Sequence, residues 1–115
     1  MIQIYHNARC GKSRNCLAFL NSNNLEYQII NYLVDIPTFE DCTTIIKKLK
    51  INPIDLIRQK EKIWIDFYKN KVLTNQEIIQ AMIENPILME RPIVVFDNEA
   101  IIARDLEKLA DFFNL

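Results

Sequence analysis

The sequence predicts a single α/β domain over residues 1–115, in which a β-α-β unit, a helical insert at about residues 36–86 and a β-β-α unit follow one another. Three observations support this. Strand-like runs occur only towards the two ends of the chain, apolar residues between them recur at spacings of three and four, and turn residues separate the segments. At 115 residues, with 50% hydrophobic and 25% charged residues, the chain has the size and composition of one globular domain.

The opening β-α-β unit begins with a short predicted strand that contains Ile2 and Ile4 and stops at Asn7. The segment NARCGKS follows as a loop, and Ser13 is the expected N-cap of a helix. That helix carries apolar side chains at helical spacing, which are Cys16, Leu17 and Leu20. It should fray in the polar run 21–24, and a second strand is expected over about 26–31.

The middle of the chain has helical periodicity and is expected to form three or four helices. Thr38 with Asp41 and Thr74 with Glu77 have the spacing of capping boxes, in which the side chain and backbone of two residues satisfy each other at a helix start. Pro53 is placed to open the second helix at its first turn, and Pro86 to end the last one.

The closing β-β-α unit starts after Pro92 with IVVF, the most strand-like run of the sequence. Asp97 and Asn98 form a turn signal, the run AII predicts a short strand after it, and 106–113 read as an amphipathic helix.

The charge balance of 14 basic against 15 acidic residues excludes a globally basic nucleic-acid binder, so we expect no nucleic-acid partner. No apolar run approaches the roughly 20 residues that cross a bilayer, and no secretory pattern opens the chain, so we expect a cytoplasmic protein without a membrane contact. Three cysteines, an odd number, suit a reducing compartment. One histidine and scattered cysteines predict no metal site. We expect a monomer.

Cys10 is the strongest candidate for chemistry. It is expected between a strand and a helix, where backbone N–H groups lack intrahelical partners and favour an anion. Arg9, Lys12 and Arg14 add positive charge, and Gly11 permits a backbone conformation that a side chain would penalise. Such surroundings lower the pKa of a thiol and create the nucleophilic thiolate. The alternative is a small buried hydrophobic residue.

The motif around this thiol is C-x-x-S, which ends at Ser13, so the neighbouring cysteine of a thioredoxin-type pair is absent. An external thiol must therefore resolve any intermediate on Cys10. Cys16 is interpreted as a core residue, with a redox partner as the alternative, and Cys42 as structural. His6 is either a hydrogen-bonded structural group or a residue that tunes Cys10 electrostatically.

Five segments spread over the chain carry a family resemblance, and they are HNARCGKSRN, NYL at 31–33, LIR at 56–58, NPILMERPIVV at 85–95 and IIAR at 101–104. In this order they resemble the ArsC family, the arsenate reductases coupled to glutathione and glutaredoxin. The cysteine loop with the ERPIVV block is the most specific part of the likeness.

The resemblance implies a thioredoxin-like fold with a helical insertion and a cis peptide bond before Pro92. It implies that Cys10 is the nucleophile, and that Arg58, Arg91 and Arg104 bind the oxyanion. It also assigns supporting roles to His6 and Ser13. The implied substrate is arsenate, glutathione is the co-substrate, glutaredoxin is the protein partner, and no cofactor is tightly bound.

The residues themselves support the arginines less strongly. Guanidinium groups grip oxyanions with paired hydrogen bonds, and Arg91 directly precedes a buried-looking strand. Arg58 and Arg104 alone would be interpreted as surface salt-bridge residues. Two departures from the family stand out: Ala8 replaces a common proline, and Asp105 places a carboxylate where it could engage Arg104 or repel arsenate.

Two other functions fit the sequence. A thiol oxidoreductase that acts on a glutathione mixed disulfide would use Cys10 without an arginine cage. A regulator similar to Spx, which shares this fold and docks on RNA polymerase, would typically carry a C-x-x-C switch where this chain has Cys10 and Ser13.

Overall fold

The structure is a computed structural model that describes all residues, 1–115, and it divides into two compact units. The first unit contains residues 1–35 and 91–115, and the second contains residues 36–90. The predicted insert at about 36–86 begins with the second unit and ends before its last residue. That the two units make one domain stays a prediction. None of the helices combines the length and the apolar character that a membrane span requires.

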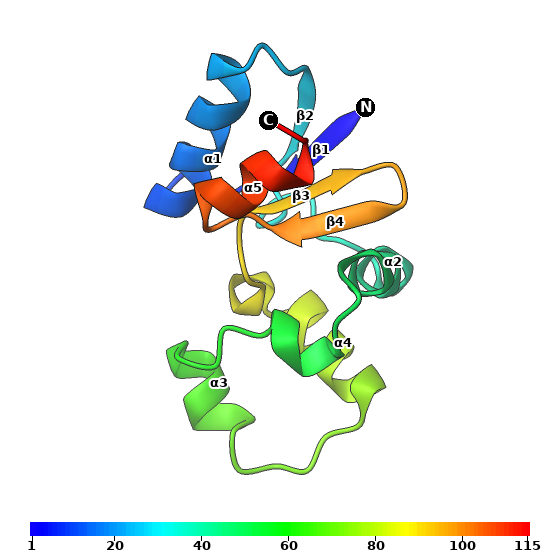
Figure 1. Cartoon of the computed structure of the whole chain (residues 1–115). Coiled ribbons are helices and arrows are strands. Elements are labelled where there is room, and N and C mark those ends of the chain that lie inside the picture. The colour runs from blue at the N-terminus through cyan, green and yellow to red at the C-terminus, as the bar shows by residue number, and fades with distance from the viewer. The chain divides into compact units, whose positions relative to one another are not determined.

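The first unit contains a four-stranded sheet in which the strands lie in the order β2-β1-β3-β4 (Figure 1). β1 (Ile2–Tyr5) pairs in parallel with β2 (Tyr27–Ile30) and antiparallel with β3 (Ile93–Phe96). β4 (Glu99–Ile102) pairs antiparallel with β3 through a turn in which Asp97 has a φ of 54°. These pairings confirm the predicted mixed α/β class, although β1 ends at Tyr5 and not at Asn7.

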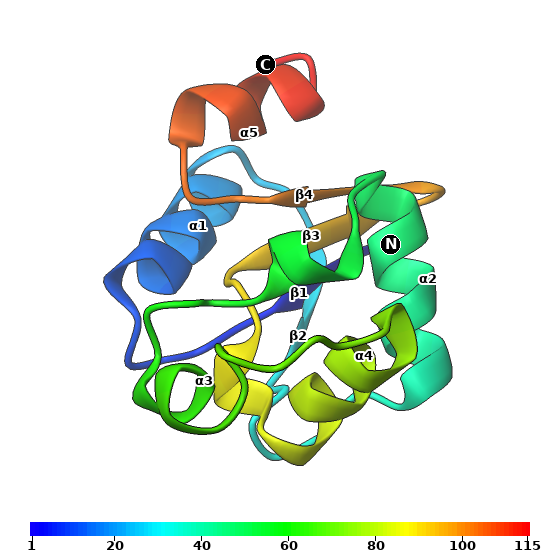
Figure 2. The same cartoon turned by 90° about the horizontal axis from the view of Figure 1, so that it is seen from below.

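Two helices of the first unit, α1 (Gly11–Ser22) and α5 (Leu106–Phe112), pack on one face of this sheet (Figure 2). Alternate strand residues point to the same face, so Ile2 and Ile4 contribute to one core together with side chains from both helices. The buried residues of this core are Ile2, Ile4, Cys16, Leu20, Val94, Ala103 and Leu109. The core holds α1, and with it the start of that helix, in a defined place over the strands.

The second unit consists of helices. Its elements are α2 (Phe39–Leu49), the 3₁₀ turn η1 (Pro53–Leu56), α3 (Lys62–Phe67), α4 (Asn75–Glu84) and the 3₁₀ turn η2 (Pro86–Leu88). The expectation of three or four helices is therefore met by three α-helices and two 3₁₀ turns.

Both predicted capping boxes are present, with Thr38 at the start of α2 and Thr74 at the start of α4. The expectation for Pro53 is only half correct, because Pro53 opens the short 3₁₀ turn η1 and no α-helix. The chain leaves η1 at Ile57, which is extended and forms a β-bridge with Met89. This pairing stops the helix that the local sequence would allow.

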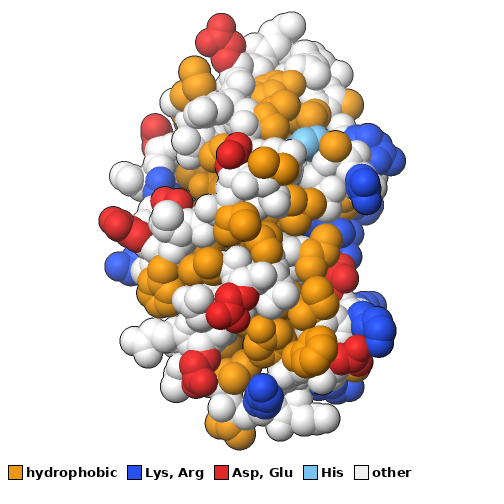
Figure 3. Space-filling model, turned by 180° about the vertical axis from the view of Figure 1, so that it is seen from behind, with side chains coloured by type: hydrophobic (Ala, Val, Ile, Leu, Met, Phe, Trp, Pro, Cys, Tyr) orange, Lys and Arg blue, Asp and Glu red, His pale blue; other side chains and the backbone are white.

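Acidic and basic side chains are both present on the face of the molecule that Figure 3 shows, together with many hydrophobic ones. This mixture agrees with the formal net charge of -1.

Candidate active site

Cys10 occupies the junction between β1 and α1. The N–H of His6 still bonds the Ile30 carbonyl at 2.9 Å, so strand pairing continues one residue beyond β1 and then stops. A turn follows in which the N–H of Cys10 bonds the Asn7 carbonyl at 3.0 Å, and α1 begins directly after it. Cys10 itself has extended φ and ψ angles of −92° and 123° and is the N-cap. The prediction of Ser13 as N-cap is wrong, because this turn starts the helix earlier.

The pKa of Cys10 is lowered from its ordinary value of 9.0 to about 6. Partial burial on its own raises this pKa, but hydrogen bonds to the sulfur from the Ser13 backbone N–H and the Arg91 side chain outweigh that effect. The Lys12 backbone N–H and the Ser13 hydroxyl lower the pKa further. A thiol with this pKa is mainly thiolate at neutral pH, and the thiolate is the nucleophilic form.

Arg9, Lys12 and Arg14 were expected to lower the pKa of Cys10 through their positive charge, but the structure gives them other roles. Lys12 lowers the pKa of Cys10 through its backbone N–H, while its side chain is exposed. The Arg14 guanidinium donates to the Ala8 carbonyl at 3.0 Å and so braces the loop. Arg9 is exposed. Directed hydrogen bonds, and not a general positive field from the loop, therefore account for the thiolate.

Ser13 is fully buried in the first turn of α1 and connects Cys10 to the loop before it. Its Oγ accepts the backbone N–H of Asn7 in a long contact of 3.4 Å. A serine hydroxyl has a single hydrogen, which is then free to be donated to the Cys10 sulfur. This arrangement agrees with the supporting role that was assigned to Ser13.

Gly11 does not play the conformational part that the sequence suggested. No glycine of the chain has a positive φ, and a Cβ at position 11 would meet only the Arg14 Nη2 at 3.7 Å, an ordinary contact. The expected steric reason for glycine is therefore wrong. The position is simply the first helical residue, which any small side chain fits.

His6 is 8% exposed, and its pKa is lowered by burial and by the nearby charge of Arg14. Its Nδ1 is buried without a hydrogen-bond partner. A lowered pKa keeps the ring neutral at neutral pH, so His6 adds no positive charge at the loop. Between the two interpretations left open by the sequence, the neutral buried ring argues against an imidazolium that stabilises the thiolate.

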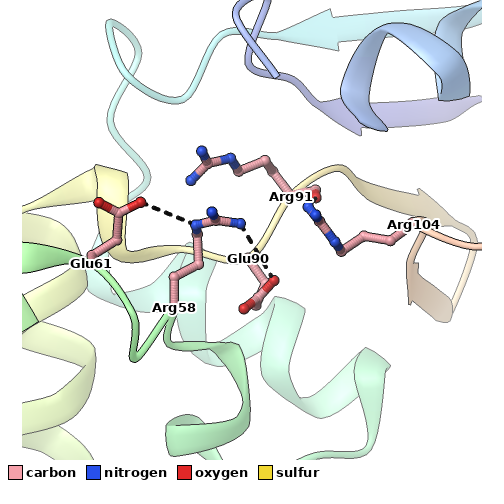
Figure 4. A network of polar contacts seen from close by, with 5 residues as sticks. All are labelled: Arg58, Glu61, Glu90, Arg91 and Arg104. Atoms are coloured by element: carbon pink, nitrogen blue, oxygen red, sulfur yellow. Dashed lines mark hydrogen bonds and ion pairs between the residues drawn. The ribbon is translucent and has the colours of Figure 1, made fainter. Parts of the chain in front are cut away.

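Arg91 and Arg104 come together in the first unit. The peptide bond from Arg91 to Pro92 is cis, as the family resemblance implied. Arg91 is 9% exposed, and its side chain donates to the Cys10 sulfur. Arg104 donates from Nη1 to the Arg91 carbonyl at 2.8 Å, which Figure 4 shows as a guanidinium ending at the Arg91 backbone. Arg104 therefore braces the segment that carries Arg91.

Arg58 belongs to the second unit, where two carboxylates engage it (Figure 4). Its Nε lies 3.2 Å from Glu61 Oε1, and its Nη1 lies 3.9 Å from Glu90 Oε2. The backbone N–H of Arg58 also bonds the Leu88 carbonyl at 2.7 Å. These contacts agree with the salt-bridge interpretation of Arg58, and its oxyanion-binding role stays a prediction.

Asp105 has a structural partner of its own. Its carboxylate accepts the N–H groups of Glu107 at 2.9 Å and Lys108 at 3.3 Å, and it thereby caps α5. The sequence suggested that Asp105 could engage Arg104, but the guanidinium of Arg104 donates to the Arg91 carbonyl instead. The departure from the family pattern at this position is explained by helix capping.

The other two cysteines are buried thiols. Burial raises the pKa of Cys16 to about 12, and burial together with the charge of Asp41 raises the pKa of Cys42 to about 11. Cys16 lies in the core of the first unit, as its main interpretation predicted. Only Cys10 therefore combines access with an ionised sulfur. No three His, Cys, Asp or Glu side chains are grouped so that they could hold a metal ion.

Asn7 is the residue of this loop that the sequence analysis missed. It is 4% exposed, and its Oδ1 accepts the N–H of Arg9 at 3.0 Å. A usable signal was present, because an asparagine side chain readily bonds the N–H two positions later in a turn. The run Asn7-Ala8-Arg9 before the cysteine has that spacing.

Comparisons with known proteins point to one family. The model of the ArsC family matches residues 5–112. The chain is 40% identical over 119 aligned residues to the uncharacterized protein YfgD of Escherichia coli, with 96% of this chain and 94% of that protein covered. It is 32% identical to an arsenate reductase of Neisseria meningitidis, with 94% of each chain covered.

Among solved structures, the arsenate reductase of Vibrio cholerae superposes with a TM-score of 0.90 at 33% identity, with 96% of this chain and 95% of that chain covered. The agreement extends over both units of the chain. It confirms the thioredoxin-like fold with a helical insertion that the resemblance implied.

Proposed function

Because the chain belongs to the ArsC family, we propose that it is an arsenate reductase in which Cys10 is the nucleophile. One observation carries the proposal. The sulfur of Cys10 is accessible at the start of α1, with its pKa lowered to about 6 by N–H donors and the Arg91 side chain. These donors suit an incoming oxyanion as well as a thiolate.

The reaction that we propose starts with attack of the Cys10 thiolate on arsenic. A protonated arsenate oxygen leaves as water, and a thiol–arsenate adduct remains. Glutathione adds to the arsenic and expels a second water. A further thiol then attacks the glutathione sulfur, which forms a disulfide and leaves the two electrons on arsenic. Hydrolysis releases arsenite and restores Cys10. The contribution of the protein is a positioned thiolate and positive charge where negative charge develops.

The further thiol belongs to glutaredoxin in this proposal. The C-x-x-S motif supports an external donor, because Ser13 cannot form a disulfide and Cys16 and Cys42 are buried. No tightly bound cofactor is needed for these steps. A cytoplasmic location and a monomeric state stay predictions.

Arg91 is the oxyanion ligand with the strongest support, because its side chain already reaches the sulfur that would attack. Arg104 uses one Nη1 hydrogen to hold the Arg91 carbonyl, and its other donors remain for substrate. Arg58 is the third arginine implied by the family resemblance. It would have to exchange at least part of its contact with Glu61 or Glu90 for arsenate.

The test is oxidation of NADPH in a mixture of the protein, arsenate, glutathione, glutathione reductase and glutaredoxin. Wild-type protein should give arsenate-dependent oxidation, and Cys10→Ser should reduce it to the background. Cys42→Ser is the matched control and should keep most of the rate. Equal rates for wild type and Cys10→Ser would refute the reductase.

A thiol oxidoreductase that acts on glutathione mixed disulfides is the second candidate. The engagement of Arg58 by two carboxylates favours it, since such an enzyme needs no third guanidinium for an oxyanion. Alkylation of Cys10 distinguishes the two functions. Arsenate, phosphate or sulfate should slow the alkylation if the arginine site binds oxyanions, and should leave it unchanged for the mixed-disulfide enzyme.

A regulator of the Spx type is not supported by any feature of the site. Ser13 stands where the second cysteine of its switch would be, and that serine is buried and bonded within the loop. Stoichiometric recovery of RNA polymerase subunits with the tagged protein would revive this alternative.

A further inference from the structure

We propose that Asn7 is a positioning residue of the Cys10 site, because its polar groups close the turn that places the sulfur at the start of α1. The inference rests on the proposed function for its biological meaning. Its physical content, the placement of a thiolate, can be measured without arsenate.

The contacts of Asn7 all lead to the cysteine loop. Its Oδ1 accepts the N–H of Arg9 at 3.0 Å, and its carbonyl accepts the N–H of Cys10 at 3.0 Å. Its own N–H donates to Ser13 Oγ at 3.4 Å. A side-chain turn is thus nested inside a backbone turn over residues 7–10, and both share Asn7 as their first residue.

Because Asn7 is buried, loss of its side-chain hydrogen bond should disturb the turn. Asn7 is 4% exposed and its bond to the Arg9 N–H is partly buried, so loss of the side-chain acceptor removes a protein partner that water replaces only in part. The loop contains no proline, and the one glycine that follows Cys10 has no special conformation. Apart from the Asn7 contacts, the brace across the loop is the bond from Arg14 to the Ala8 carbonyl at 3.0 Å.

Asn7 affects the Cys10 sulfur in two ways, through the position of Cys10 in the turn and through the hydroxyl of Ser13. The turn sets where Cys10 stands relative to the Lys12 and Ser13 N–H groups, and hydrogen bonds weaken steeply when their angle is lost. The Asn7 backbone N–H occupies the Ser13 oxygen and leaves the hydroxyl hydrogen for the thiolate, and the Asn7 side chain acts on this bond only through the conformation of the turn. Loosening the turn therefore weakens several donors at once.

The experiment measures the rate of Cys10 alkylation by iodoacetamide against pH. Asn7→Ala should raise the thiol pKa of Cys10 by about one pH unit, because a loosened turn misaligns the Lys12 and Ser13 donors that face the sulfur. The plateau rate at high pH should stay within about twofold of wild type, because the thiolate itself remains accessible. Asn23→Ala is the matched control, since that asparagine is exposed and bonds the Phe19 carbonyl at the other end of α1.

Ala8→Pro provides the rescue. Ala8 is exposed and takes the second position of the turn over residues 7–10, where proline is favoured because its ring sets φ. In the Asn7→Ala background this substitution should return the thiol pKa at least halfway to the wild-type value. A purely structural role for Asn7 would give a lower midpoint of urea unfolding with no movement of the thiol pKa.

Asn7→Gln, which moves the acceptor by one methylene, serves if Asn7→Ala does not fold. A wild-type thiol pKa in whichever variant folds overturns the proposal, and so does failure of both variants to fold, because Asn7 would then support the whole unit. Absence of arsenate turnover in the wild-type protein would refute the proposed function and leave this measurement intact.

Discussion

The first turn of α1 and the middle of the same helix hold the same side chain in opposite states. Cys10 at the first turn has its pKa lowered to about 6, whereas burial raises the pKa of Cys16 in the middle to about 12. Burial acts in the same direction on both sulfurs. The difference comes from donors, because N–H groups at a helix start lack intrahelical partners and those in the middle are already bonded.

This difference shows that the chemistry of a cysteine in this fold depends on which backbone and side-chain donors face it. Cys16 has apolar neighbours from both helices and the sheet. Cys10 faces the N–H groups of Lys12 and Ser13, together with the side chain of Arg91 from a distant part of the chain. The predictions below test this contrast, in order of decreasing effect.

Selective alkylation is the largest expected effect. At neutral pH the thiolate fractions that follow from pKa values of about 6 and about 12 differ roughly 10⁵-fold. Iodoacetamide should therefore label Cys10 alone in the native protein, and Cys16 and Cys42 only after denaturation. Peptide mass spectrometry checks this. Rapid native labelling of Cys16 would remove the contrast between the two positions.

Loss of the Arg91 guanidinium is expected to be the next largest effect. Arg91→Ala removes a hydrogen bond to a charged sulfur and should raise the Cys10 pKa by about one to two pH units. Alkylation rates against pH provide the measurement. Arg9→Ala is the control, since this exposed arginine should change the pKa by less than about 0.3. Equal shifts in both variants would mean that general charge, and not a directed bond, stabilises the thiolate.

The stability of the protein should depend on pH through Cys10. Its pKa is about 6 when folded and near 9.0 without the site, so the ionised sulfur stabilises the fold fully above pH 9 and loses that effect as the pH falls through 6. The unfolding free energy of wild type minus Cys10→Ala should rise by about 1–2 kcal/mol from pH 6 to pH 9, after solvent screening. Urea unfolding at both pH values measures it, and a flat difference would contradict the lowered pKa.

Gly11→Ala should have the smallest effect. Because a Cβ fits at this helical position, alanine should leave the Cys10 pKa unchanged and stabilise the protein by about 0.5 kcal/mol. Thermal unfolding and the alkylation profile check the two parts. A loss of stability, or a higher thiol pKa, would restore the conformational role that the sequence suggested for the glycine.

Local signals predicted much of the fold. The capping boxes at Thr38 and Thr74 are present because each forms between residues three apart in the chain, which need no distant partner. The turn at Asp97 and Asn98 and the helix after Asp105 are local in the same sense. One prediction failed where a distant contact decided the outcome, at Pro53, whose turn ends when Ile57 pairs with Met89. Another failed locally, at Ser13, because the turn from Asn7 to Cys10 starts α1 earlier.

The candidate site was predicted in part. Cys10 was identified from its place between a strand and a helix, and the cis bond before Pro92 from the family resemblance. The reasons given for Gly11 and for the loop cations were wrong, since both depend on φ angles and side-chain directions that composition does not reveal. Asn7 was missed although its spacing to Arg9 gave a local signal, because its burial and its contact with Ser13 become visible only in the structure.

Residue order along the chain was enough to predict the α/β class, a helical middle of the chain and the cysteine that we propose as the nucleophile. These features depend on periodicity and on short-range capping, which neighbouring residues decide among themselves. Only the tertiary structure decided which donors ionise that cysteine. Arg91 reaches Cys10 because β3 pairs with β1, a contact between the two ends of the chain that no local pattern specifies.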